Sequence, residues 1–243
     1  MTDHDVAGTT PPRTPHHAGW DSYWDRDPRG ARRLYAVIAS IYRRLFICPR
    51  LAWWLARTFP QGSTLLHAGC GSGEVDALIN RRFRITGLDI SPRALERYRK
   101  NNPHAAATLH ADLMQMSCTG ELYDGIYSLG VLEHFTPADI RHILHEMKKV
   151  LRPGGRMVAF WPLAGAISVK VLGLCHRALN RSGRPAVELH PPEITLLRSR
   201  THAEELLHSA GWKLVSYSVS PCDLLIQAVV VCEPLPEASD GMA

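Results

Sequence analysis

Leu65-Leu66-His67-Ala68-Gly69-Cys70-Gly71-Ser72-Gly73-Glu74 is the most informative stretch of this chain. A short apolar run leads into three glycines at alternate positions, which predicts a strand that turns tightly into a helix. Glycine adopts positive φ and carries no Cβ, so the backbone can approach a ligand closely, and the following helix offers unpaired N–H groups. We therefore expect a ligand-binding turn at this place.

An acidic residue closes the next apolar run, Arg84-Ile85-Thr86-Gly87-Leu88-Asp89-Ile90-Ser91. A carboxylate at the C-terminal end of a second parallel strand can accept hydrogen bonds from both ribose hydroxyls. Dinucleotide-binding proteins use G-x-G-x-x-G, in which glycines make room for a pyrophosphate, whereas this chain has G-x-G-x-G. The two runs together favour a nucleoside ligand.

Three later segments complete an ordered set of motifs: Leu109–Leu113, Tyr123–Phe135 and Val150–Val158. With this set the chain resembles the class I S-adenosylmethionine-dependent methyltransferases over roughly residues 60–165. Within them it is similar to the branch of ubiquinone and menaquinone C-methyltransferases and many natural-product enzymes. The resemblance implies S-adenosyl-L-methionine as cofactor and S-adenosyl-L-homocysteine as product.

The length of 243 residues and the apolar content of 45% suit one α/β domain with an added substrate-binding part. Strands alternate with helices from Ser63 onward, which predicts a doubly wound parallel sheet. Strands are expected at 64–68, 85–89, 107–110, 125–129, 156–161, 212–220 and 224–232, and helices at 74–80, 92–100, 137–151 and 201–210. The resemblance implies a Rossmann-like seven-stranded sheet with an antiparallel last strand.

The segments outside the sheet are assigned by composition and position. Residues 1–19 and 234–243 are expected to be disordered, 20–60 to form a helical cap, and 61–233 to form the cofactor-binding domain. Residues 162–200 follow the fifth strand and are expected to form a helical lid, with an apolar helix near Val169 to Leu179. Because ligands of open α/β sheets bind at the C-terminal strand ends, lid and cap are expected to form the acceptor pocket.

The resemblance also implies which residues hold the cofactor. The glycine turn would pass under the methionine and ribose, an acid would hold the ribose hydroxyls, the third motif would lie beside the adenine, and the end of the fourth strand would face the methionine. In that order these residues are Gly69, Cys70, Gly71 and Gly73, then Asp89 and Ile90, then Asp112 and Leu113, then Leu129 and Gly130.

One position departs from the family. An acidic residue is common two positions before the first glycine, where this chain has His67. A neutral imidazole cannot reproduce the charge of that carboxylate toward the cationic end of the cofactor. Glu74 or a backbone carbonyl is expected to compensate.

Methyl transfer from a sulfonium is an in-line displacement, so the protein must chiefly align the acceptor and exclude water. His134 is the candidate base for an acceptor that must lose a proton, because imidazole titrates near neutral pH. The alternatives are a histidine without a catalytic duty here, or His190 as the base on the lid. Glu133 either orients His134 or begins the following turn. Tyr23 and Trp24 either close over the ligands or are buried cap aromatics.

No metal site is predicted. His142, His145 and Glu146 share a helical face without a further partner, so a solvated face is the favoured interpretation. The six cysteines are scattered without a C-x-x-C pair, which fits reduced thiols of a cytoplasmic protein.

The formal charge of +5 lies in short arginine clusters, which favours a solvated face over a nucleic-acid surface. The N-terminus lacks the apolar segment of a signal peptide. The basic, aromatic stretch from Leu34 to Phe59 is interpreted as a lid helix packed on the domain, with contact to lipid as the alternative.

The function predicted from these observations is methyl transfer to O, N or C of a small or lipid-like molecule. An RNA methyltransferase is the first alternative, because the chain is basic. A non-catalytic S-adenosylmethionine-binding protein is the second, because His67 departs from the family and a fold does not imply a function.

Overall fold

The computed structural model describes residues 20, 24, 31–166, 192–221 and 225–236. The expectations for residues 1–19, for Tyr23, for the apolar helix near Val169 to Leu179, for His190 and for residues 237–243 therefore lie outside the described part of the chain. Among the described residues, every helix is too short or too polar to cross a bilayer.

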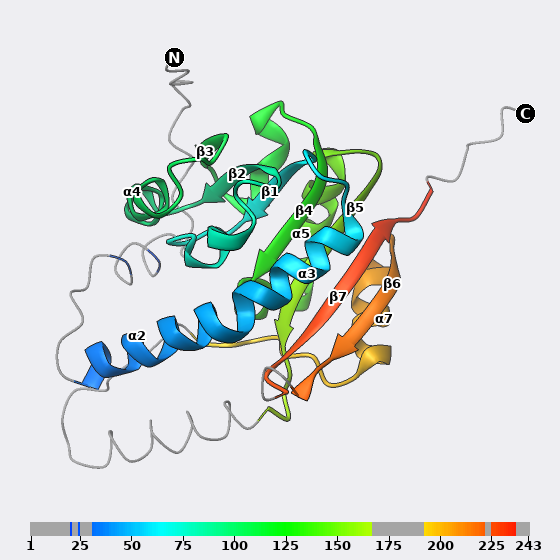
Figure 1. Cartoon of the computed structure of the whole chain (residues 1–243). Helices are drawn as coiled ribbons and strands as arrows, with labels where there is room; N and C mark the ends of the chain where they lie inside the picture. Colours follow the sequence, from blue (N-terminus) through cyan, green and yellow to red (C-terminus); the bar gives the residue numbers. More distant parts are fainter. Residues whose placement is uncertain (1–19, 21–23, 25–30, 167–191, 222–224, 237–243) are drawn as a thin grey trace, which may run out of the picture.

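Seven strands form one sheet in the order β3-β2-β1-β4-β5-β7-β6 (Figure 1). Their bounds are β1 Thr64–Ala68, β2 Arg84–Asp89, β3 Ala107–His110, β4 Tyr123–Leu129, β5 Leu151–Pro162, β6 Trp212–Val219 and β7 Gln227–Pro234. The first five strands run parallel, and β7 lies antiparallel between β5 and β6. The predicted Rossmann-like sheet with an antiparallel last strand is confirmed.

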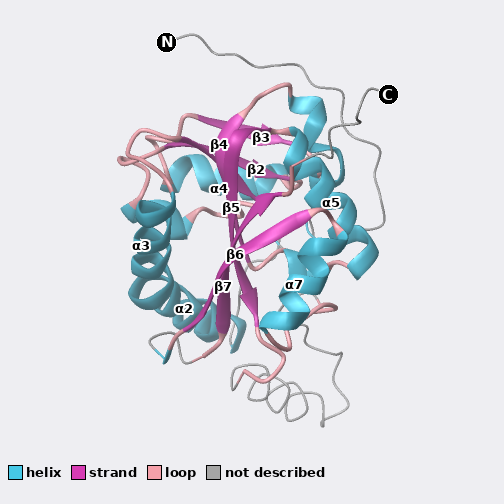
Figure 2. Ribbon diagram, turned by 90° about the vertical axis from the view of Figure 1, so that its right-hand side faces the viewer, coloured by secondary structure: helices cyan, strands magenta, loops and turns pink. Residues whose placement is uncertain are grey.

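Helices cover both faces of this sheet (Figure 2). They are α2 Ala31–Tyr42, the π-helix η1 Arg43–Ile47, α3 Cys48–Thr58, α4 Pro92–Asn101, α5 Pro137–Lys149 and α7 Arg200–Ser209, with short 3₁₀ turns η2 Glu74–Leu78, η3 Leu113–Thr119 and η4 Leu132–His134. The described part of the expected cap at 20–60 is thus helical.

The sheet divides the hydrophobic core into two clusters, because neighbouring residues of a buried strand point to opposite faces. Leu66 packs with α5 and α7, whereas Leu65 packs with Leu51 and Leu55 of α3. Strands buried on both faces read as continuous apolar runs, which is why β1 and β4 were recognisable in the sequence.

Two helix starts follow their local signals. The Ser91 hydroxyl accepts a hydrogen bond from the Ala94 N–H, and Pro92 occupies the first turn of α4. Thr136 caps α5 in the same way, and Asp139 closes a reciprocal capping box with it.

Three expectations need correction. The helix expected at 74–80 is the short 3₁₀ turn η2, because Asp76 is drawn into the core by hydrogen bonds. Strand β7 runs from Gln227 to Pro234 and not over 224–232 as expected, since its pairing with β6 extends to Trp212 opposite Pro234; Pro234 therefore lies in the sheet and not in a disordered tail. Within the expected helical lid, residues 192–199 are not helical, because their backbone groups bond to the loops beneath them.

Candidate functional site

The carboxyl ends of four neighbouring parallel strands meet at one edge of the sheet. The glycine turn follows β1, Asp89 ends β2, Asp112 follows β3 and Gly130 follows β4. Because β3, β2, β1 and β4 are adjacent in that order, all the residues predicted to hold a cofactor lie along this edge.

The three glycines of the turn all have positive φ, at +72° for Gly69, +52° for Gly71 and +66° for Gly73. A Cβ at Gly69 would lie 2.5 Å from Val131 Cγ2, and one at Gly73 would collide with Asn102 and Tyr98. A Cβ at Gly71 would meet only the Trp24 indole, at 3.0 Å, among its described neighbours. Among the described residues, the Trp24 side chain alone therefore covers the backbone of the turn at Gly71.

Asp89 joins the turn to the end of β2. Its Oδ2 accepts a hydrogen bond from the Gly71 N–H at 2.8 Å, and its Oδ1 accepts one from the Ser91 N–H at 2.9 Å. Burial raises the pKa of Asp89, and the bonds from the Ser91 and Gly71 backbone oppose that rise. Since each carboxylate oxygen has two lone pairs, both oxygens keep acceptor capacity for ligand hydroxyls.

The other predicted cofactor residues lie beside this pair. The carbonyl of Ile90 accepts from His110 Nε2, and the carboxylate of Asp112 accepts from the Met114 N–H, which caps η3. Leu113 is buried and Leu129 is half-buried at the end of β4, where Gly130 has a φ of +67°. The Cys70 thiol is buried, and burial raises its pKa.

His67 belongs to a buried polar cluster that sequence reasoning missed. Its Nδ1 donates to Asp76 Oδ2 at 2.9 Å, the Tyr98 hydroxyl donates to the same oxygen at 2.8 Å, and the Tyr127 hydroxyl donates to Asp76 Oδ1 at 2.9 Å. The His67 ring also stacks on Tyr127, with ring centroids 4.4 Å apart. The Asp76 carboxylate therefore lies buried beside His67, beneath the glycine turn.

Nothing local in the sequence marks this cluster. Asp76 stands between Val75 and Ala77, and its tyrosine partners come from α4 and β4. Burial and the Asp76 carboxylate raise the pKa of both Tyr98 and Tyr127, so both hydroxyls stay protonated as donors.

Glu74 turns away from the predicted role near the cofactor. Its carboxylate accepts from Arg43 Nη1 at 2.9 Å and from the Ser40 hydroxyl at 3.2 Å. These bonds attach α2 and η1 to the turn.

His134 lies after β4 at the same edge. Its Nδ1 is 2.9 Å from the carbonyl of Pro192, and because a carbonyl only accepts, Nδ1 carries the hydrogen. In a neutral ring Nε2 is then the basic nitrogen. Trp20 contacts the His134 ring edge-on, with centroids 5.0 Å apart.

Glu133 points into the protein and does not orient His134. Its side chain is 3% exposed, and its Oε2 has no hydrogen-bond partner among the described residues. Burial raises the pKa of Glu133 to about 8, and nearby Glu193 adds to the rise. Its backbone carbonyl accepts from the N–H groups of Ile194 and Thr195, which holds the segment 192–199 across this edge.

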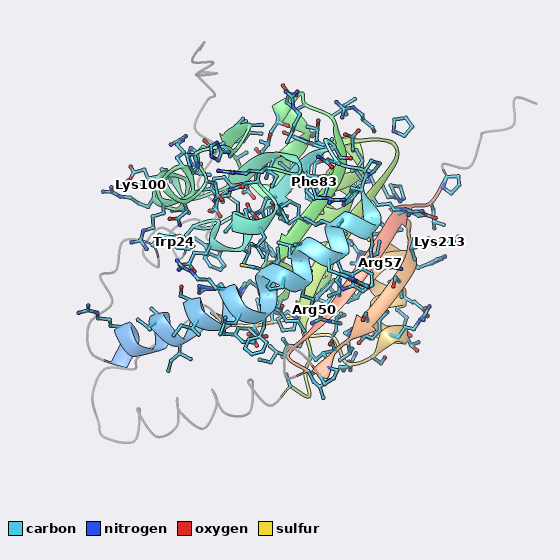
Figure 3. The ribbon with its side chains drawn as sticks, viewed as in Figure 1. Trp24, Arg50, Arg57, Phe83, Lys100 and Lys213 are labelled. Atoms are coloured by element: carbon cyan, nitrogen blue, oxygen red, sulfur yellow. The ribbon has the colours of Figure 1, made fainter. Side chains whose placement is uncertain are left out.

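Trp24 is the described part of the cap that reaches the glycine turn. Arg97 of α4 donates to the Trp24 carbonyl at 2.9 Å and lies over its ring, 5.6 Å from the centroid. Figure 3 labels Trp24, which lies near the helix that carries Lys100. Trp24 thus covers Gly71 while Trp20 contacts His134, which agrees with a cap that lies over the ligand edge.

His142 and Glu146, two of the three residues considered for a metal, have other partners. His142 Nε2 pairs with the carbonyl of Met114, and Glu146 accepts from Ser117 and Lys149. No metal-ligating group of three residues occurs in the described ranges. A hollow of about 370 Å³ lies at the opposite edge of the sheet, lined by Phe59, Asp124 and Arg152 among others, and is remote from the glycine turn.

The family described as "Methyltransferase domain" matches residues 65–155, which contain the glycine turn, Asp89 and the loop after β4. Residues 65–155 are thus similar to a methyltransferase domain. The chain is also 30% identical over 103 residues to 27-O-demethylrifamycin SV methyltransferase of Amycolatopsis mediterranei, which covers 40% of this chain and 37% of that protein.

The chain has further relatives. It is 33% identical over 109 residues to 2-phytyl-1,4-naphtoquinone methyltransferase of Thermosynechococcus vestitus, covering 42% of this chain and 47% of that protein. The match therefore spans less than half the length of either curated relative. Among solved structures, the "DhpI-SAH complex structure" has a TM-score of 0.65 at 16% identity, covering 92% of this chain and 100% of that one. This likeness confirms the fold of the domain.

Proposed function

We propose that this chain is an S-adenosyl-L-methionine-dependent methyltransferase that acts on O, N or C of a small or lipid-like molecule. The observation that carries the proposal is the Asp89 carboxylate bonded to Gly71 of the glycine turn, at the edge where four parallel strands end. The relatives named for a rifamycin and a naphthoquinone acceptor support the small-molecule class.

The residues along this edge fit such a cofactor. Asp89 would accept from the ribose hydroxyls, Gly71 would lie beneath the sugar, and Leu113 would cover the adenine beside Asp112. The Asp76 carboxylate would replace the missing acid at position 67 as the negative charge near the sulfonium end. Trp24 would shift from Gly71 or cover the bound ligand.

The cofactor, when bound, supplies a methyl group on an already activated leaving group. The chain would then need to exclude water and hold the acceptor in line, which the segment 192–199 and the cap tryptophans are placed to do. His134 Nε2 would take the proton from an acceptor hydroxyl or carbon acid. The loss of this base is expected to lower turnover more than cofactor affinity.

The decisive experiment is calorimetric titration with S-adenosyl-L-homocysteine. The wild-type protein is expected to bind, and Asp89→Asn to bind at least about tenfold more weakly, because one charged acceptor of two hydroxyl bonds is lost. Glu96→Gln, an exposed change on α4, is the matched control and should bind like wild type. Unchanged affinity in Asp89→Asn, with an unaltered circular dichroism spectrum, would overturn the ribose assignment.

A small-molecule acceptor is proposed over RNA. The exposed arginines include many with carboxylate partners, such as Arg152 with Asp124 and Arg200 with Glu204. Tight RNA binding that collapses with salt would contradict the small-molecule proposal.

We also assign the chain to the cytoplasm. Cys48, Cys70 and Cys232 are free and buried in the described structure, and burial raises the pKa of each thiol, which lowers its reactivity; free thiols of this kind support the proposed compartment.

A further inference from the structure

The outward face of α2 and η1 carries large apolar side chains at the surface. Val37 is 49% exposed, Ile38 57%, Ile41 51% and Leu45 64%. Residues four apart in a helix are neighbours, so Val37, Ile41 and Leu45 follow one another along one side. A contiguous exposed apolar surface of this kind on a globular protein marks an interaction site.

This exposure belongs to the part of the helical rod that extends past the core. None of the described side chains of α2 is buried, whereas Ile47, Leu51 and Leu55, further along the rod in η1 and α3, are buried in the core. Arg43 and Ser40 bond to Glu74 and fix the rod to the glycine turn. Figure 1 shows α2 continuing the line of α3 beyond the strands, so its outer side faces away from the sheet.

The charge around this surface has one sign. Residues 31–58 contain six arginines and no aspartate, glutamate or lysine. Arg43 pairs with Glu74, and Arg50 donates to the carbonyls of Ser218 and Gln227, so these two are engaged with the body of the protein. Arg33 and Arg44 are exposed, four residues before Val37 and three after Ile41, and so they flank the apolar side chains.

Aromatic side chains extend the surface along the rod. Phe46 is 39% exposed and Trp53 is 53% exposed, and Arg57 lies over the Trp53 ring at 4.6 Å from its centroid. Tryptophan and arginine beside exposed aliphatic residues are typical of helices that lie in a lipid interface, where rings sit at the headgroup level and guanidinium groups meet phosphates.

We propose that the surface formed by Arg33, Val37, Ile38, Ile41, Arg44 and Leu45, here named the α2 face, docks on an anionic lipid bilayer. Its apolar side chains enter the boundary between headgroups and acyl chains, and Arg33 and Arg44 contact lipid phosphates. A second copy of the chain is the weaker fit, because a two-fold contact through this surface would bring like charges together. The proposal concerns binding alone and does not depend on methyl transfer.

The test is sedimentation of the full chain with vesicles of phosphatidylcholine and phosphatidylglycerol in equal parts, beside vesicles of phosphatidylcholine only. Binding is expected to the anionic vesicles and to weaken with salt. Ile38→Ser with Leu45→Ser is expected to lower the partition coefficient about tenfold or more. The matched control is Leu122→Ser with Val215→Ser, which replaces exposed apolar residues on other elements and should bind like wild type.

A second variant separates the charge from the apolar part. Arg33→Gln with Arg44→Gln should reduce binding to anionic vesicles and leave the circular dichroism spectrum unchanged, since both side chains are exposed. Three outcomes would overturn the proposal: no binding of the wild-type chain to anionic vesicles, equal binding to neutral ones, or an equal loss in the control. A concentration-dependent dimer in sedimentation velocity that Ile38→Ser with Leu45→Ser abolishes would assign the α2 face to a second copy instead.

Discussion

At the scale of single residues, the Asp76 carboxylate holds three side chains together beneath the glycine turn. It accepts hydrogen bonds from His67, Tyr98 and Tyr127 and is fully buried. Asp76→Ala is expected to lower the free energy of unfolding by about 3–5 kcal/mol, because three buried donors lose their partner. Urea unfolding measures this loss.

Tyr98→Phe is the control for Asp76→Ala. It removes one of the three donors and leaves the ring in place, so the expected loss is about 0.5–1.5 kcal/mol. A loss in Asp76→Ala no larger than that of Tyr98→Phe would show that the carboxylate does not stabilise the cluster as a unit.

Glu133 predicts a dependence of stability on pH. Its pKa is raised to about 8 in the folded protein, from 4.5, chiefly by burial. Between these values the folded protein keeps a proton that the unfolded chain has lost, so the stabilising contribution is fully present below about pH 4.5 and is lost as pH rises through about 8. Each unit by which the pH rises within this window lowers the free energy of unfolding by up to about 1.4 kcal/mol.

Glu133→Gln isolates this effect, because the amide stays neutral at every pH. The free energy of unfolding of this variant relative to wild type should rise by roughly 2–3 kcal/mol from pH 5.5 to pH 7.5. Urea unfolding at the two pH values measures the change. A difference between the two proteins that does not vary with pH would show that Glu133 is ionised in the folded state.

At the scale of elements, the start of α5 depends on a reciprocal cap. Thr136 accepts from the Asp139 N–H, and the Asp139 side chain accepts from Thr136. Thr136→Ala should cost about 1 kcal/mol of unfolding free energy, since backbone donors of the first turn lose their partner. The control is Thr201→Ala, because Thr201 is exposed in the first turn of α7 and Ser199 caps that helix; this change should alter stability little. A loss in Thr201→Ala equal to that in Thr136→Ala would show that the Thr136 cap does not stabilise α5.

At the scale of the whole molecule, the antiparallel hairpin of β6 and β7 is joined to the parallel part of the sheet. Strand β7 pairs with β5, and the buried Trp212 of β6 donates from Nε1 to the carbonyl of Leu144 in α5 at 3.0 Å. Trp212→Ala is expected to lower the free energy of unfolding by about 3–5 kcal/mol. Far- and near-ultraviolet circular dichroism should report one and the same unfolding transition. The exposed Trp53→Ala is the control, and separate transitions would show that the hairpin unfolds independently.

Much of the fold followed from short patterns because these depend on neighbours in the chain. The alternation of apolar runs with helices predicted β1 and β3 at their observed bounds, and Ser91 and Thr136, residue types that favour helix N-caps, cap α4 and α5. The sequence did not predict the 3₁₀ turn at Glu74, because the apolar pattern there is typical of a longer helix, whereas the Asp76 side chain lies in the core.

The candidate site divides in the same way. The glycine turn and Asp89 were found because strand-end position and residue type suffice to predict them, and the positive φ values of the three glycines agree with that prediction. The buried cluster of His67, Asp76 and the two tyrosines could not be found, since Tyr127 lies 51 residues from the Asp76 carboxylate it contacts. The exposure of the α2 face was equally hidden, because an apolar helical stripe predicts burial against whatever lies beside it.

Local pattern alone therefore predicted the α/β sheet, which the structure confirms, and the strand edge that we propose binds a nucleoside ligand, because strand period, glycine and cap residues act over a few positions. Only tertiary packing decided which polar side chains are buried with Asp76, how far burial raises the pKa of Glu133 and which side chains of α2 remain exposed. Those properties depend on what surrounds each side chain, and its surroundings come from distant parts of the chain.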